Sequence, residues 1–138
     1  MFVGATRDPA SPDAEAVVRH EVAEFSVVKA LIPTAPGQAV IRAWGLLEYQ
    51  LNVASDRIAP GQPRGWPQVA NNLEAWDKWP LLYPAVQELQ RLRDYTVRSS
   101  QPPSSAAADR YVSVAESLVT TLLTSPLPPP SESPGDAG

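Results

Sequence analysis

Apolar residues recur at spacings of three and four along most of this chain, as they do on one face of an α-helix. The clearest repeat predicts a helix over about residues 38–58, with an apolar seam of Val40, Trp44, Leu47, Leu51, Ala54 and Ile58. A similar pattern predicts a helix over residues 11–32, with Ser11 as its cap and a seam of Val18, Val22, Phe25, Val28 or Lys29, and Ile32. His20, Glu21 and Glu24 are expected on the polar face of that first helix.

Proline and serine residues predict the ends of three further helices. Pro67 favours the start of a short helix over residues 66–79, which is expected to end before Pro80. The next helix is expected over residues 81–100, starting near Pro84. Ser104 or Ser105 should cap a last helix with a broad apolar stripe made of Ala108, Tyr111, Val112, Ala115, Leu118, Val119 and Leu122. No segment shows the alternation of a strand, so we predict an all-α fold, an up-and-down bundle of four long helices plus one short helix.

Composition divides the chain into one domain and two flanking segments. Residues 1–10 form a polar lead that we expect to be flexible, and residues 11–124 are long enough for a single helical bundle with one core. Residues 125–138 are rich in proline and polar residues, so we expect an extended, disordered tail. The tail contains a PxxP spacing within residues 126–130, which would suit a polyproline-binding partner.

The overall charge and the absence of cysteine exclude several classes of function. The formal net charge of -4 and the pI of about 4.9 give no general attraction to phosphate backbones, so RNA binding would require a local basic patch. Without cysteine the chain has no disulfide, no thiol nucleophile and no cysteine-bound zinc. No apolar run is long enough for a membrane segment and no targeting segment is visible, so we expect a soluble, cytoplasmic protein.

Arg93 falls in the middle of the apolar face of the fourth predicted helix. Its neighbours on that face are Leu82, Val86, Leu89, Thr96 and Val97. A buried arginine without a partner is unfavourable, so the position predicts either an ion pair with an acid on a neighbouring helix or a contact with a ligand. Glu48, at the edge of the seam over residues 38–58, is the first candidate for that structural ion pair, and Glu74 and Glu88 are the alternatives.

Four segments together resemble the HEPN superfamily of helical domains, and its DUF4145-like branch in particular. They are VIRAWGLLEYQL (residues 40–51), DKW (77–79), LQRLRDYTVR (89–98) and SSAAADRYVSVAESLVTTL (104–122), so the resemblance covers about residues 39–123. It implies a helical bundle with a functional motif on the fourth helix. Many members dimerise through their motif helices, so the resemblance also implies a homodimer.

The motif implied by this resemblance is incomplete. Active HEPN ribonucleases carry an arginine, then a polar residue, and a histidine a few residues later. Here the candidate motif residues are Arg93, Asp94 and, in the place of the histidine, Arg98. Arginine keeps its proton near neutral pH and cannot act as a general base, and Asp94 would repel phosphate. The resemblance therefore implies a non-catalytic module for protein interaction or dimerisation. The alternative is a weak metal-independent ribonuclease, or a domain that binds RNA or a nucleotide through Arg93 and Arg98.

Other candidate sites are weaker. His20 and Glu24 stand four residues apart, but two ligands do not make a metal site, so we expect no metal and no cofactor. Arg91 and Arg98 share one helix face and are candidates for binding an anion or an acidic partner, with ordinary surface charge as the alternative. No phosphate-binding glycine loop and no nucleophile motif is present. The expected partners are a second copy of the chain or another protein.

Overall fold

The protein folds entirely into helices over the residues that the structure describes. The computed structural model describes residues 12–61 and 65–130, where no strand is present. The helices are α1 (Pro12–Leu31), α2 (Pro36–Ile58), α3 (Trp66–Leu73), α4 (Trp79–Arg98) and α5 (Ser105–Thr124). Within these two ranges, no helix combines the length and the apolar character needed to cross a membrane. The all-α prediction is confirmed.

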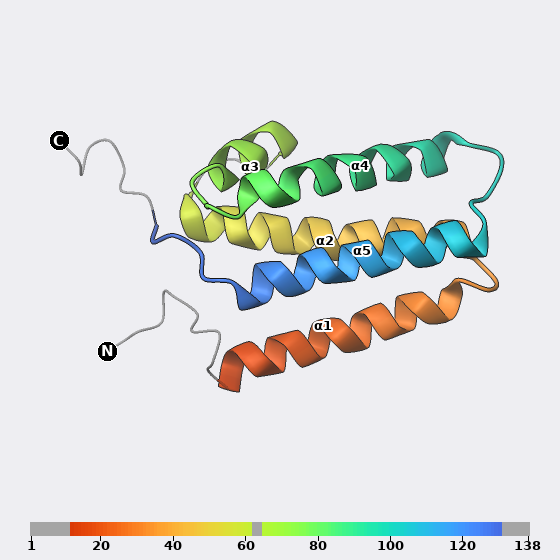
Figure 1. Ribbon diagram of the computed structural model, residues 1–138, viewed down its shortest axis with the longest axis horizontal. Helices are drawn as coiled ribbons and strands as arrows, with labels where there is room; N and C mark the ends of the chain where they lie inside the picture. Colours follow the sequence, from red (N-terminus) through yellow and green to blue (C-terminus); the bar gives the residue numbers. More distant parts are fainter. Residues whose placement is uncertain (1–11, 62–64, 131–138) are drawn as a thin grey trace.

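The four long helices run alternately in opposite directions, and the short α3 lies beside the end of α2 (Figure 1). Helices α2 and α5 make the closest packing in the bundle and run in the same direction. Helix α1 packs on one side of this pair and α4 on the other, so that α2 contacts each of the other four helices. One continuous hydrophobic core joins all five.

The apolar seams of α2 and α5 are buried as the sequence predicts. Every predicted seam residue of both helices belongs to the core. Ser104 caps α5, and its Oγ accepts a hydrogen bond from the Ala107 amide at 3.0 Å. The N-terminal halves of the two helices also contribute small buried residues, which let the helices approach closely: Ala39, Ala43 and Ala108.

Pro80 lies in the first turn of a helix, where the sequence analysis expected a helix to end. Helix α3 ends at Leu73, and α4 begins at Trp79, with Pro80 in its first turn. The first turn tolerates proline because an amide there would have no intrahelical partner. Pro36 likewise opens α2 before the expected residue 38. Helix α4 continues through Pro84, whose ring lies at an exposed position.

Two apolar faces differ from their predictions at single positions. In α1, Glu21 takes the seam position that we assigned to Val22, because the buried positions run 21, 25, 28, 32. Val22 is exposed instead. In α4, Val97 was predicted on the core face but is 56% exposed, because it lies in the last turn of the helix.

Glu21 forms a buried polar contact between α1 and α2. Its side chain is only 7% exposed, and Oε1 accepts a hydrogen bond from Gln50 Nε2 at 3.2 Å. Oε2 is buried and has no hydrogen-bond partner among the described residues. Burial raises the pKa of the Glu21 carboxyl, while the Gln50 hydrogen bond and His20 act in the opposite direction and Glu24 adds to the rise. The folded state therefore favours the protonated form more than the unfolded chain does.

The segment that follows α5 packs at its start. Trp76 Nε1 donates a hydrogen bond to the Pro126 carbonyl at 3.0 Å, and Leu127 packs against the core. The prediction of an unpacked tail over residues 125–138 is wrong for these two residues, because a buried indole needs an acceptor and the tail supplies one. Residues 131–138 and the predicted lead over residues 1–10 lie outside the described residues.

The raised pKa of Glu21 predicts a specific pH dependence of stability. Because the folded-state pKa lies above the unfolded value of about 4.5, the parent loses stability as pH rises from about 4.5 through the folded-state pKa. Glu21→Gln keeps the shape of the neutral acid and removes this loss. We expect the variant to be more stable than the parent at pH 7 and equal to it below pH 4.5, measured by chemical denaturation. Glu15→Gln, at an exposed carboxylate on the same helix that does not act on the Glu21 pKa, is the control and should not reproduce this crossover.

Candidate functional site

Arg93 projects from α4 toward α2 and lies over an aromatic ring. Its side chain is 30% exposed, and Cζ lies 5.8 Å from the centre of the Trp44 ring. Trp44 belongs to the buried seam of α2, so its ring is held in place by the core. A guanidinium over an indole face is stabilised by a cation–π interaction. The predicted arginine in the core face is thus half-buried against an aromatic partner.

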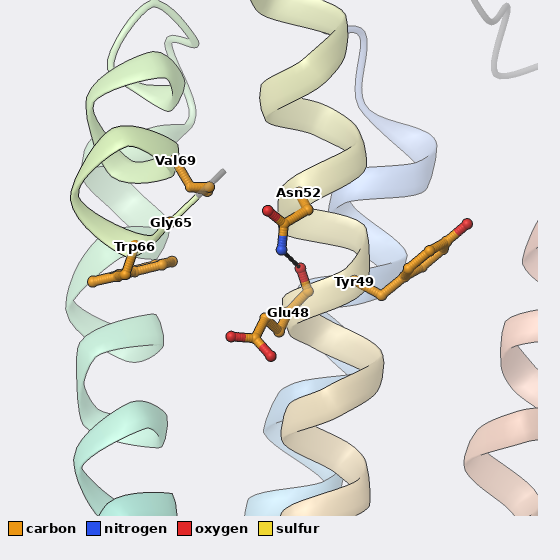
Figure 2. A pocket seen from close by; sticks show the side chains of 6 residues that line it. All are labelled: Glu48, Tyr49, Asn52, Gly65, Trp66 and Val69. Carbon is orange, nitrogen blue, oxygen red and sulfur yellow. Dashed lines mark hydrogen bonds between the residues drawn. The ribbon is translucent and has the colours of Figure 1, made fainter. Parts of the chain in front are cut away.

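The carboxylate that pairs with Arg93 is its neighbour in sequence. Arg93 Nη2 lies 3.3 Å from Asp94 Oδ1, whereas the expected pair with Glu48 is not formed. Glu48 lies one turn beyond Trp44 on α2, and its side chain points toward α3 (Figure 2). The Trp44 ring therefore occupies the position opposite Arg93 that we had assigned to a carboxylate. The two alternative acids do not replace it, because Glu74 lies in the turn after α3 and Glu88 pairs with Arg91.

Two nitrogen donors of this site are buried and have no hydrogen-bond acceptor among the described residues. They are Arg93 Nε and Trp44 Nε1. The Asp94 carboxylate satisfies only one edge of the guanidinium. The cation–π contact and the packing of the arginine stem therefore supply most of the structural role of Arg93.

Tyr111 contributes the α5 side of the site. Its hydroxyl donates a hydrogen bond to the Leu89 carbonyl of α4 at 2.8 Å. Burial raises the pKa of the Tyr111 hydroxyl strongly, and the nearby positive charge of Arg93 reduces that rise. This hydrogen bond joins α4 to α5, and the raised pKa keeps the Tyr111 hydroxyl a neutral donor throughout the ordinary pH range.

The two other predicted binding residues lie on the outer surface of α4. Arg91 is exposed and forms a bidentate pair with Glu88, with Nε 3.1 Å from Oε1, and this pair lowers the pKa of Glu88 and raises that of Arg91. Arg98 is exposed in the last turn of the helix, and no ion pair between described residues includes it. The two arginines of the predicted motif therefore lie on different sides of α4: Arg93 faces α2 and Arg98 faces outward.

Metal-binding side chains do not gather in the part of the chain that the structure describes. His20 Nε2 lies 3.7 Å from Glu24 Oε1 on the exposed side of α1. No group of three or more histidine, cysteine, aspartate or glutamate residues is close enough to hold a metal ion in the described ranges. In the described ranges, His20 and Glu24 therefore contact each other without a third metal ligand nearby.

Sequence analysis missed the two aromatic residues that surround Arg93. Trp44 and Glu48 are one turn apart on α2, so the spacing that nominated Glu48 nominates Trp44 equally well. Tyr111 was assigned to the apolar stripe of α5 without a partner for its hydroxyl. A buried tyrosine hydroxyl needs an acceptor, and this requirement was the available signal.

Comparison with protein-family models, with curated proteins and with solved structures finds no match to this chain. The function of the site is therefore inferred from its own geometry. The resemblance of residues 39–123 to HEPN domains remains a prediction based on the four sequence segments.

The cation–π contact predicts that Arg93 contributes to stability through its stem and its charge. Arg93→Ala removes both, and we expect a loss of about 1–2 kcal/mol in the free energy of unfolding, measured by urea denaturation. Arg93→Met keeps an apolar stem over Trp44 and should lose about half as much. Arg42→Ala, at an exposed arginine of α2 outside this site, is the matched control, and we expect its unfolding midpoint to equal that of the parent. A parent-like midpoint for Arg93→Ala would show that the Trp44 contact contributes nothing.

Proposed function

We propose that this chain is a non-catalytic helical module of HEPN type that self-associates through the outer face of α4. The observation that carries the proposal is the exposure of two large apolar side chains on that face. Leu81 is 77% exposed and Tyr95 is 61% exposed. They are fourteen residues, or about four turns, apart, so they point to the same side of the helix. Helix α4 lies at one edge of the bundle (Figure 1), and both residues are rotated around the helix away from Arg93, which faces α2.

The charges between these two residues favour a second copy as the partner. Glu88 stands midway between Leu81 and Tyr95, and Arg91 is one turn further along. If two copies of α4 pack antiparallel about a two-fold axis at Glu88, Leu81 of each copy meets Tyr95 of the other. The Glu88 and Arg91 charges can then pair across the axis, which offsets the repulsion between the two glutamates. The face is therefore complementary to itself.

The surroundings of the motif support a non-catalytic role. The arginine that would steady a phosphate in an active member is half-buried over Trp44, and its nearest carboxylate is that of Asp94. Arg98, in the place of the histidine, cannot accept a proton near neutral pH. The alternative of RNA or nucleotide binding would need a phosphate to compete with Asp94 for Arg93. It would also rely on Arg98, which faces outward from the far end of α4.

Sedimentation of the full chain tests the self-association. The chain has a mass of 14.9 kDa, and we expect a concentration-dependent species of twice that mass at about 10–500 μM. Leu81→Asp or Tyr95→Asp should weaken the dimer at least about tenfold, because each places a charge in an apolar contact. Val27→Asp is the matched control, since Val27 is exposed on α1 at the opposite side of the bundle. A monomer at all concentrations, or a dimer indifferent to both α4 variants, would contradict the proposal.

A parallel measurement separates the alternative function. Labelled single-stranded RNA is incubated with the chain in excess chelator, and both cleavage and retardation are followed. We expect neither. Retardation that falls with salt and is lost in a folded Arg98→Ala variant would instead identify a nucleic-acid-binding domain.

A further inference from the structure

A pocket of about 310 Å³ opens between α2 and the start of α3. Its lining consists of Glu48, Tyr49, Asn52, Gly65, Trp66 and Val69 (Figure 2). Gly65 has φ +148°, a conformation that residues with a side chain rarely adopt, and it directs the chain into α3 beside α2. None of the described lining residues belongs to α4, so the role of the pocket does not depend on the self-association proposed above.

Two side chains of α2 offer acceptor oxygens to this pocket, those of Glu48 and Asn52. The Glu48 carboxylate has no ion pair or hydrogen bond with any described residue. Asn52 donates through Nδ2 to the Glu48 backbone carbonyl at 2.9 Å, which leaves its Oδ1 as an acceptor. Among the described lining residues there is no lysine, arginine or histidine. The solvent-exposed Glu48 carboxylate is the one charged group among them, so this part of the pocket favours a cation over an anion.

The other wall of the pocket is aromatic and apolar. Trp66 and Val69 lie on the α3 side, across from the Glu48 carboxylate (Figure 2). The Trp66 ring meets the Trp44 ring edge to face, with 6.3 Å between centres, so the buried core holds it in position. An indole face attracts a cation, and its apolar body also covers the hydrocarbon part of a ligand.

We infer that this pocket binds an organic ammonium group, either a free alkylamine or a lysine side chain of a partner. The Glu48 carboxylate pairs with the ammonium, and Trp66 and Val69 cover the alkyl chain and the charge. A bare metal ion fits less well, because no cluster of three carboxylate or histidine ligands exists in the described parts of the chain. The volume suits a chain of about four carbons and is at the lower end of the range of ligand pockets.

Glu48 also faces the positive end of α3, where Gly65 has no side chain to act as a cap. A carboxylate that served only to compensate this dipole would affect stability without affecting amine binding. The two roles therefore predict different behaviour of the same variant. Glu48→Gln tests both, because glutamine keeps the size of the side chain and removes its charge.

The test is a titration of the ¹⁵N-labelled full chain with n-butylamine hydrochloride at constant ionic strength. The indole resonances of the four tryptophans are followed, and that of Trp66 is assigned with Trp66→Phe. We expect the Trp66 resonance to shift with a Kd on the order of millimolar. Sodium butyrate, an anion of similar size, should leave it unmoved. Glu48→Gln should weaken binding at least about fivefold, whereas Glu74→Gln, an exposed acid outside the pocket, should not change it.

Two results would overturn the inference. One is a Trp66 shift that butyrate or sodium chloride reproduces. The other is a folded Glu48→Gln variant that binds butylamine like the parent, even if its stability is altered. Titration with a blocked lysine, N-acetyl-lysine N-methylamide, then distinguishes the source of the ammonium. Tighter binding of the blocked lysine than of butylamine would identify a partner's side chain, and tighter binding of butylamine would identify a free amine.

Discussion

The close packing of α2 against α5 determines where the other helices can lie. Small buried residues in the N-terminal halves of the two helices let their backbones approach each other. Helices α1 and α4 are then displaced to opposite flanks (Figure 1). Helix α4 touches α5 much less than it touches α2, and the Tyr111 hydrogen bond bridges the wider side. Arg93 is half-buried because of this arrangement. Its side chain packs on the surface of α2 and is not enclosed by all four long helices.

Four hydrogen bonds, two of them buried and two partly buried, fix the register of this apolar bundle. An apolar seam alone allows a helix to slide by one turn with little loss, whereas a buried hydrogen bond is satisfied in one position only. Each contact joins two different segments of the chain, and together they involve all five helices: Glu21 with Gln50, Asn72 with Ser55, Tyr111 with Leu89, and Trp76 with Pro126. The bundle thus combines a general hydrophobic driving force with a few specific links.

Sequence periodicity predicted most of the fold because the seams of α2 and α5 are uninterrupted. The prediction failed where the same local sequence is compatible with two structures. Proline both ends a helix and opens one, so Pro80 was assigned to the wrong side of the boundary between α3 and α4. In α1, either Glu21 or Val22 satisfies the spacing, and the hydrophobic choice was wrong because Gln50 on α2 offers Glu21 a hydrogen bond. Such pairings between distant residues cannot be seen in one sequence.

The candidate site was predicted only in part. The position of Arg93 on the core face follows from the helical repeat, and the structure places it there, half-buried. Its partners depend on the angle between α2 and α4, which sequence spacing does not determine. A ring, not a carboxylate, lies opposite the guanidinium, and the acid that pairs with it is Asp94, the next residue. The outward direction of Arg98 is a similar consequence of the helix repeat, since five residues rotate it away from Arg93.

The hydrogen bond from Trp76 to Pro126 links the start of the proline-rich segment to the stability of the core. A polyproline-binding protein that took Pro126 into its groove would have to remove this acceptor and uncover Leu127. The Trp76 donor would then be left without its acceptor in a largely apolar site, which is unfavourable. By thermodynamic linkage, such a partner binds this segment more weakly in the folded chain than in an isolated peptide. Its binding destabilises the turn between α3 and α4 by the same free energy. The folded domain thus competes with outside proteins for its own C-terminal segment.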